Sequence, residues 1–160
     1  VIEYARNCAD LKEANSEEFD EKSNSSEDHL IYHLSKWIKD QKVEIRSKVQ
    51  NKGGTMRLGA YPAKIKKGTM AYSIYKKAIV SERHRHRFEV NVNYQEALED
   101  NGLTFSGFSQ DGLLPEVVEL SSHPFFLGVQ FHPELKSKPF EPHPIFSAFI
   151  KKALEQTRLV

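Results

Sequence analysis

The most constraining feature of this sequence is the segment 126–134, in which an apolar run ends in His, Pro and Glu. Its large apolar side chains favour a buried strand, and Pro133 ends that strand because proline has no N–H for the ladder. His132 and Glu134 are two residues apart, the spacing that puts side chains on one side of an extended chain. A carboxylate there can hold an imidazole in one tautomer, so the pair is predicted to be a general base and its orienting acid.

The composition bounds the class of protein. The chain has 160 residues, of which 39% are hydrophobic and 28% charged, and these values are typical of one globular domain. A net charge of +1 gives no overall field that favours nucleic acid or an anionic membrane. The apolar runs are too short to span a bilayer, and no signal-peptide pattern is found. We therefore expect a soluble, cytoplasmic protein that binds neither nucleic acid nor membrane.

The periodicity of apolar residues predicts an α/β domain in which strands alternate with flanking helices. Helices are expected over residues 1–14, 27–40, 69–77, 94–101 and 142–154. Strands are expected over residues 42–48, 55–67, 78–93, 103–108, 114–120 and 126–131. Residues 15–28 are expected to form a loop and residues 51–54 a turn.

Two single residues need an interpretation of their own. Cys8 is the only cysteine, which excludes an internal disulfide and suits a reducing compartment. It falls on the apolar stripe of the first helix, so a buried small hydrophobe is favoured over a reactive thiol. His143 precedes the last helix and is expected at the surface or as a cap rather than as a metal ligand.

The segment 82–91 alternates arginine with histidine. On an extended chain the three arginines (Arg83, Arg85, Arg87) share one side, and the other side carries His84, His86 and Phe88. The arginines would suit a substrate carboxylate, which arginine binds with two hydrogen bonds, or a phosphate. A zinc site through His84 and His86, helped by His132 or His143, stays open, although no cysteine cluster supplies further ligands.

Four sequence blocks together carry a family resemblance. The block GVQFHPE (128–134) resembles the C-terminal signature of class I glutamine amidotransferases. With GGTMRLG (53–59), ERHRHRFEVN (82–91) and NSEEF (15–19), in this order along the chain, it looks like the glutaminase domain of CTP synthases. The resemblance implies a partial flavodoxin-like, three-layer α/β domain that lacks its first strands. Residues 1–160 would be the C-terminal part of a single amidotransferase domain, with the amidoligase domain absent from this chain.

The resemblance also implies roles for individual residues. His132 matches the general base of a Cys-His-Glu triad, and Glu134 matches the acid that orients it. Glu18 matches the acid that binds the α-amino group of glutamine, and Arg87 matches an arginine that helps to bind glutamine. Arg46 matches an arginine of a lid-like loop near which the activator GTP acts.

By the same resemblance, glutamine is hydrolysed and the ammonia serves the ATP-dependent amination of UTP to CTP. ATP, Mg²⁺ and UTP would bind to the synthetase domain, this chain would need no cofactor or metal, and the intact enzyme would be a homotetramer. The family's nucleophile is a cysteine in a Gly-x-Cys-x-Gly elbow, which this sequence lacks. We therefore expect a chain truncated before the nucleophile and inactive alone. The alternative is a non-catalytic remnant that acts as a binding or regulatory module.

Overall fold

A computed structural model describes residues 1–19, 29–33, 36–39, 42–45 and 56–157 of the chain. Within these residues, five strands form the main sheet in the order β5-β4-β7-β8-β9. They are β4 (Arg57–Ile65), β5 (Ile79–His86), β7 (Leu103–Ser109), β8 (Pro115–Leu120) and β9 (Leu127–Val129). All neighbouring pairs in this sheet are antiparallel.

Two smaller antiparallel pairs lie beside the main sheet. One joins β1 (Ile31–His33) to β6 (Phe88–Val90), and the other joins β2 (Lys36–Lys39) to β3 (Lys42–Ile45). A short 3₁₀ turn, η1 (Glu17–Phe19), precedes β1, and a second, η3 (Val92–Tyr94), follows β6. The β1–β6 pair therefore brings the NSEEF block next to the end of the arginine-histidine block.

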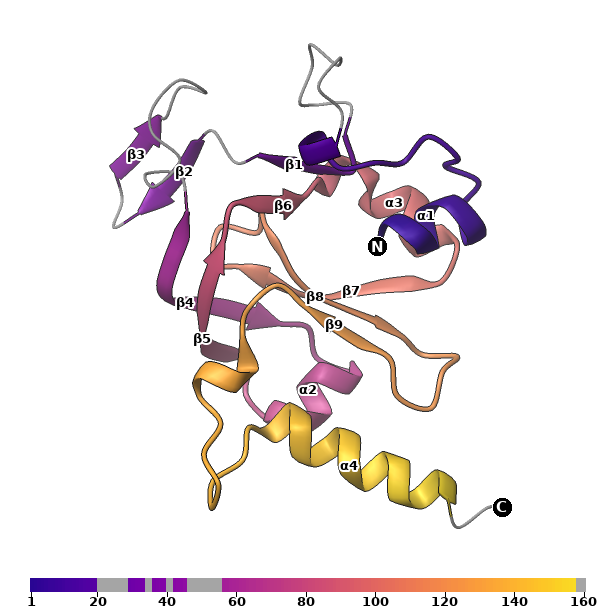
Figure 1. Cartoon of the computed structure of the whole chain (residues 1–160), viewed down its shortest axis with the longest axis vertical. Helices are drawn as coiled ribbons and strands as arrows, with labels where there is room; N and C mark the ends of the chain where they lie inside the picture. The colour runs from indigo at the N-terminus through magenta and orange to yellow at the C-terminus, as the bar shows by residue number, and fades with distance from the viewer. Residues whose placement is uncertain (20–28, 34–35, 40–41, 46–55, 158–160) are drawn as a thin grey trace.

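Helices cover the main sheet on two sides (Figure 1). The helices α1 (Ile2–Cys8) and α3 (Gln95–Asp100) lie on one side, and α2 (Met70–Tyr75) and α4 (Pro144–Thr157) lie on the other. Each side has its own buried apolar cluster. Around α1 and α3 the cluster includes Ala5, Leu98 and Phe105, and around α2 and α4 it includes Ala71, Phe131 and Ile145. The predicted mixed α/β architecture is confirmed.

Most predicted elements are found with shorter bounds, but the helix predicted over residues 27–40 is wrong. That segment contains β1 and β2 instead. Ile31 and Tyr32 are β-forming residues whose backbone pairs with Val90 and Glu89 of β6. This non-local pairing overrides the helical spacing of the apolar residues. The predicted strand over 42–48 is observed as β3, and the predicted turn at 51–54 lies outside the described residues.

The expectation that Cys8 is buried is also wrong, because its side chain is exposed. The helix ends at Cys8, and Asp10 then turns the chain with a positive φ of 53°. Ala5 is the residue of α1 that is fully buried, so the apolar contact of this short helix is centred one turn before the cysteine. None of the helices that the structure describes is long and apolar enough to cross a membrane.

The close packing of β7 against its neighbours can be tested at Gly107. A methyl group placed there would lie 2.8 Å from Val117 Cγ2 and 3.1 Å from Ile65 Cδ1. We expect Gly107→Ala to lower the free energy of unfolding by about 1–3 kcal/mol through overpacking. Urea unfolding measures this change. In a Val117→Ala background the added methyl should cost less, and strictly additive effects of the two substitutions would contradict the packing explanation.

Candidate functional site

The predicted base and acid lie side by side where the chain leaves β9. His132 Nδ1 is 2.7 Å from Glu134 Oε1, so Nδ1 donates to the carboxylate and Nε2 is left to accept a proton. The backbone N–H of His132 donates to the Arg83 carbonyl at 2.8 Å, which ties the following turn, η4 (Pro133–Leu135), to β5. The hydrogen bond from His132 holds the pKa of Glu134 below its ordinary value.

A buried carboxylate, that of Glu82, forms an ion pair with Lys136, the residue that follows this turn. Glu82, which is 1% exposed, lies 3.1 Å from His143 Nε2 and 3.4 Å from Lys136 Nζ. Burial favours the neutral form of Glu82, but the hydrogen bond from His143 and the positive charge of Lys136 outweigh it and lower the pKa of Glu82. The expected surface position of His143 is wrong, since the side chain is buried. Its Nδ1 does accept from the N–H of Ile145 at the start of α4, as a cap does.

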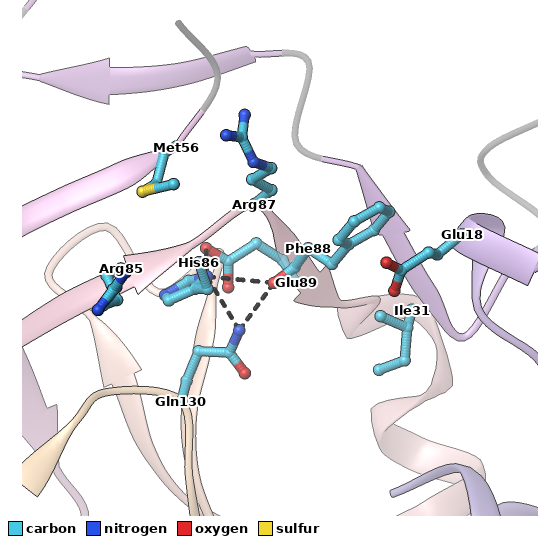
Figure 2. Close-up of a pocket in the computed structure, with 9 residues that line it drawn as sticks. All are labelled: Glu18, Ile31, Met56, Arg85, His86, Arg87, Phe88, Glu89 and Gln130. Atoms are coloured by element: carbon cyan, nitrogen blue, oxygen red, sulfur yellow. Dashed lines mark hydrogen bonds and ion pairs between the residues drawn. The ribbon is translucent and has the colours of Figure 1, made fainter. Parts of the chain in front are cut away.

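A pocket of about 430 Å³ lies near the His132–Glu134 pair. This volume is large enough for one amino acid. Its lining combines one exposed and one buried carboxyl group, two arginines, an imidazole and an amide with three apolar side chains (Figure 2): Glu18, Ile31, Met56, Arg85, His86, Arg87, Phe88, Glu89 and Gln130. The structure thus brings Glu18 and Arg87 into one cavity, although they are far apart in sequence. Their assigned roles in binding glutamine stay predictions.

The pocket and the His132–Glu134 pair are neighbours rather than one cavity, because neither His132 nor Glu134 lines the pocket. Two links join them. Gln130 lines the pocket two residues before His132 in the chain, and the positive charge of Arg85, another lining residue, contributes to the lowered pKa of Glu134. Arg46, the predicted lid residue, lies outside the described residues.

A buried ionic network lies under the pocket. The Arg57 guanidinium is 2.6 Å from Glu116 Oε1 and 3.5 Å from Glu89 Oε1. The side chains of both glutamates are completely buried, and burial raises the pKa of Glu89 to about 8 and that of Glu116 to about 7, against the opposing charge of Arg57. One arginine cannot offset two buried anions. Because Arg57 is much closer to Glu116, we assign the negative charge to Glu116 and a proton to Glu89.

The two histidines of the alternating segment extend this network towards the pocket. His84 Nδ1 is 2.8 Å from His86 Nε2, and His84 Nε2 is 3.5 Å from Glu116 Oε2. Burial, followed by the charge of Arg57, lowers the pKa of His84 to about 2 and that of His86 to about 4. Both rings are therefore neutral at pH 7. Within the described part of the chain, no group of three or more His, Cys, Asp or Glu side chains is placed to hold a metal ion.

The predicted alternation holds along β5, where Arg83 and Arg85 are exposed and His84 is buried. It ends at Arg87, which occupies a bend between β5 and β6 and is half-buried. Both Arg85 and Arg87 line the pocket, and their side chains point in different directions (Figure 2).

Sequence reasoning missed four buried charged residues and one pocket amide: Arg57, Glu82, Glu89, Glu116 and Gln130. A signal was available for Glu116 and Gln130, each of which stands inside an apolar run, 113–118 or 126–131. The others lie in alternating segments, where the sequence does not say which face is covered.

Comparison with known proteins decides the family. Residues 10–152 match the sequence profile of the glutamine amidotransferase class-I family. The chain belongs to this family. Over its full length it is 55% identical to a CTP synthase of Cereibacter sphaeroides, and over 99% of its length it is 56% identical to one of Zymomonas mobilis. It spans only 29% and 28% of the lengths of these two relatives.

A solved structure agrees with the family. The glutaminase domain of the Trypanosoma brucei CTP synthase, determined with bound acivicin, superimposes with a TM-score of 0.74 at 39% identity. The match covers 97% of this chain and 56% of that structure. The chain is thus a class I amidotransferase sequence that is similar to CTP synthase glutaminase domains along essentially its entire length.

The proton assignment in the buried network predicts opposite outcomes for two matched substitutions. Glu116→Gln removes the anion that pairs with Arg57 and should lower the free energy of unfolding by about 3 kcal/mol. Glu89→Gln replaces a neutral acid with a neutral amide and should change it by less than about 1 kcal/mol near pH 7. Urea unfolding of the two variants measures both. An equal loss in both variants would contradict the assignment.

The same assignment predicts a pH dependence. The pKa of Glu89 is raised from its ordinary 4.5 to about 8. Between pH 4.5 and pH 8 the Glu89 carboxyl group is therefore ionised in the unfolded chain and protonated in the folded chain. This contribution to stability is full below pH 4.5 and disappears as the pH rises through 8, with a slope of up to about 1.4 kcal/mol per pH unit. Glu89→Gln should flatten the dependence of the free energy of unfolding on pH, measured by urea unfolding from about pH 5 to 9. An unchanged slope would contradict the assignment of a proton to Glu89.

Proposed function

We propose that this chain is the glutamine-hydrolysing part of a CTP synthase, in which His132 is the general base and Glu134 orients it. The observation that carries the proposal is the ordered His132–Glu134 pair, joined at 2.7 Å, beside a pocket lined by Glu18, Arg85 and Arg87. Such a pocket offers an anion and two cations to one small ligand. A free amino acid carries both charges and fits that arrangement.

The chemistry of the pair follows from its hydrogen bond. With Nδ1–H donated to Glu134, His132 takes a proton at Nε2 from a thiol, and the thiolate attacks the side-chain amide carbon of glutamine. The imidazolium, stabilised by Glu134, returns the proton to the departing ammonia. Water then releases glutamate from the thioester, with His132 again accepting the proton.

The thiol in this scheme is not Cys8. Cys8 is exposed at the end of α1, and in Figure 1 that helix is well separated from the orange turn after β9 that carries His132 and Glu134. We propose that the nucleophile belongs to a part of the protein outside these 160 residues. The isolated chain is then expected to hydrolyse no glutamine.

We further propose that the whole protein uses this ammonia to make CTP. The ammonia passes to a synthetase domain, where ATP and Mg²⁺ support the amination of UTP to CTP, and GTP acts as activator. The natural protein is proposed to be a cytoplasmic homotetramer. The high identity to CTP synthases over this region supports these proposals.

Glutamate release by the full-length natural protein tests the function. We expect His132→Ala to lower kcat/KM for L-glutamine by about 10²–10⁴-fold. Glu134→Gln should lower it less, because the imidazole is kept and only its orientation and charge support are lost. His123→Ala is the matched control, since His123 is an exposed turn residue, and it should leave the rate within about twofold of wild type.

Two results would contradict the proposal. If the full-length protein released no glutamate while binding glutamine or another partner, the chain would be a non-catalytic binding module. If the isolated 160-residue chain hydrolysed glutamine in a manner dependent on His132, the nucleophile would lie within it.

A further inference from the structure

Gln130 lines the pocket and also contacts His86, a member of the buried network. Its backbone N–H donates to the Glu116 carbonyl at 2.9 Å, and its side-chain Nε2 is 2.7 Å from the Phe88 carbonyl and 3.0 Å from His86 Nδ1. Figure 2 shows the amide oxygen turned away from both of these partners. Among the residues that the structure describes, none makes a hydrogen bond to this oxygen.

The orientation of this amide is set by the Phe88 carbonyl. A carbonyl oxygen only accepts, so the Gln130 atom 2.7 Å away from it must be the NH₂ nitrogen. The reversed amide would put two oxygens in repulsive contact. Gln130 Oε1 is therefore directed away from Phe88.

The His86 ring lies beside the same NH₂ group. His86 Nδ1 is 3.0 Å from Gln130 Nε2, 3.1 Å from the Phe88 carbonyl and 3.5 Å from Glu89 Oε1. His86 Nε2 is 2.8 Å from His84 Nδ1, so one of these two nitrogens carries the hydrogen between the rings. The NH₂ group of Gln130 is thus enclosed by the Phe88 carbonyl and the His86 ring.

We propose that Gln130 is a further substrate-binding residue, whose side-chain oxygen is held as a hydrogen-bond acceptor for an N–H group of the ligand in the pocket. The 2.7 Å hydrogen bond from Gln130 Nε2 to the Phe88 carbonyl positions it, with the His86 ring beside the same NH₂ group. The amide cannot turn over without losing that hydrogen bond and placing two carbonyl oxygens in contact. The pocket lining thus combines this acceptor with the cations Arg85 and Arg87.

The inference rests on the proposed function, in which the ligand is glutamine. Glutamine has two N–H groups that could meet this oxygen, the α-ammonium and the side-chain carboxamide. Two analogues separate them. The γ-methyl ester of L-glutamate has no carboxamide N–H, and glutaramate, which is glutamine without its α-amino group, has no ammonium.

The test measures the Kd of all three ligands by calorimetry on the full-length natural protein. The background is His132→Ala, so that no ligand is consumed. Gln130→Leu should weaken binding of L-glutamine by about tenfold, the effect of losing one hydrogen bond. Gln130→Met, with an unbranched side chain, should do the same if the leucine variant folds poorly. Gln110→Leu is the control, because Gln110 is exposed in the turn after β7, and it should leave Kd unchanged.

The analogues decide whether the contact is direct. The tenfold loss should vanish for the γ-methyl ester if the oxygen binds the carboxamide, or for glutaramate if it binds the ammonium, and either result supports the proposal. An equal loss for all three ligands would show a merely structural role and overturn it, as would no loss for glutamine. Absence of glutamine binding to the His132→Ala protein itself would overturn the proposed function as well, so the two failures are distinguishable.

Discussion

The ion pair between Arg57 and Glu116 is the interaction on which the rest of the site depends. At 2.6 Å and with both side chains almost fully removed from water, it fixes a negative charge inside the sheet. His84 Nε2 lies 3.5 Å from the same carboxylate, and the two histidine rings continue from there to the amide of Gln130. Separating such a buried pair is costly, so the arrangement of side chains around it is stable. The neutral acid Glu89 lies beside it because one arginine offsets only one carboxylate.

The site is assembled from β5 and β9, the two outermost strands of the main sheet, rather than from one loop. β5 supplies Arg85 and His86, the bend after it supplies Arg87, and the chain leaving β9 supplies Gln130 and then His132 (Figures 1 and 2). The N–H of His132 is bonded to the Arg83 carbonyl. This hydrogen bond ties the segment that carries the base to the strand that carries part of the pocket, which suits chemistry that needs a fixed distance between them.

Local sequence predicted the His132–Glu134 pair because its members are two positions apart and the proline between them restricts the backbone. It also predicted the alternation along β5. It failed over residues 27–40, because β1 forms by pairing with β6, a partner more than fifty residues away. The common location of Glu18 and Arg87 followed from the family resemblance alone. The buried carboxylates Glu89 and Glu116 were missed because glutamate is ordinarily exposed, and only the folded sheet shows the arginine that compensates them.

The most direct test of the account is a crystal structure of the full-length natural protein with L-glutamine bound in the His132→Ala variant. The account predicts the amino acid in the pocket lined by Glu18, Arg87 and Gln130, with its carboxamide directed towards the place of the missing imidazole and one of its N–H groups on Gln130 Oε1. Glutamine bound elsewhere, or bound in this pocket with its carboxamide turned away from position 132, would contradict it.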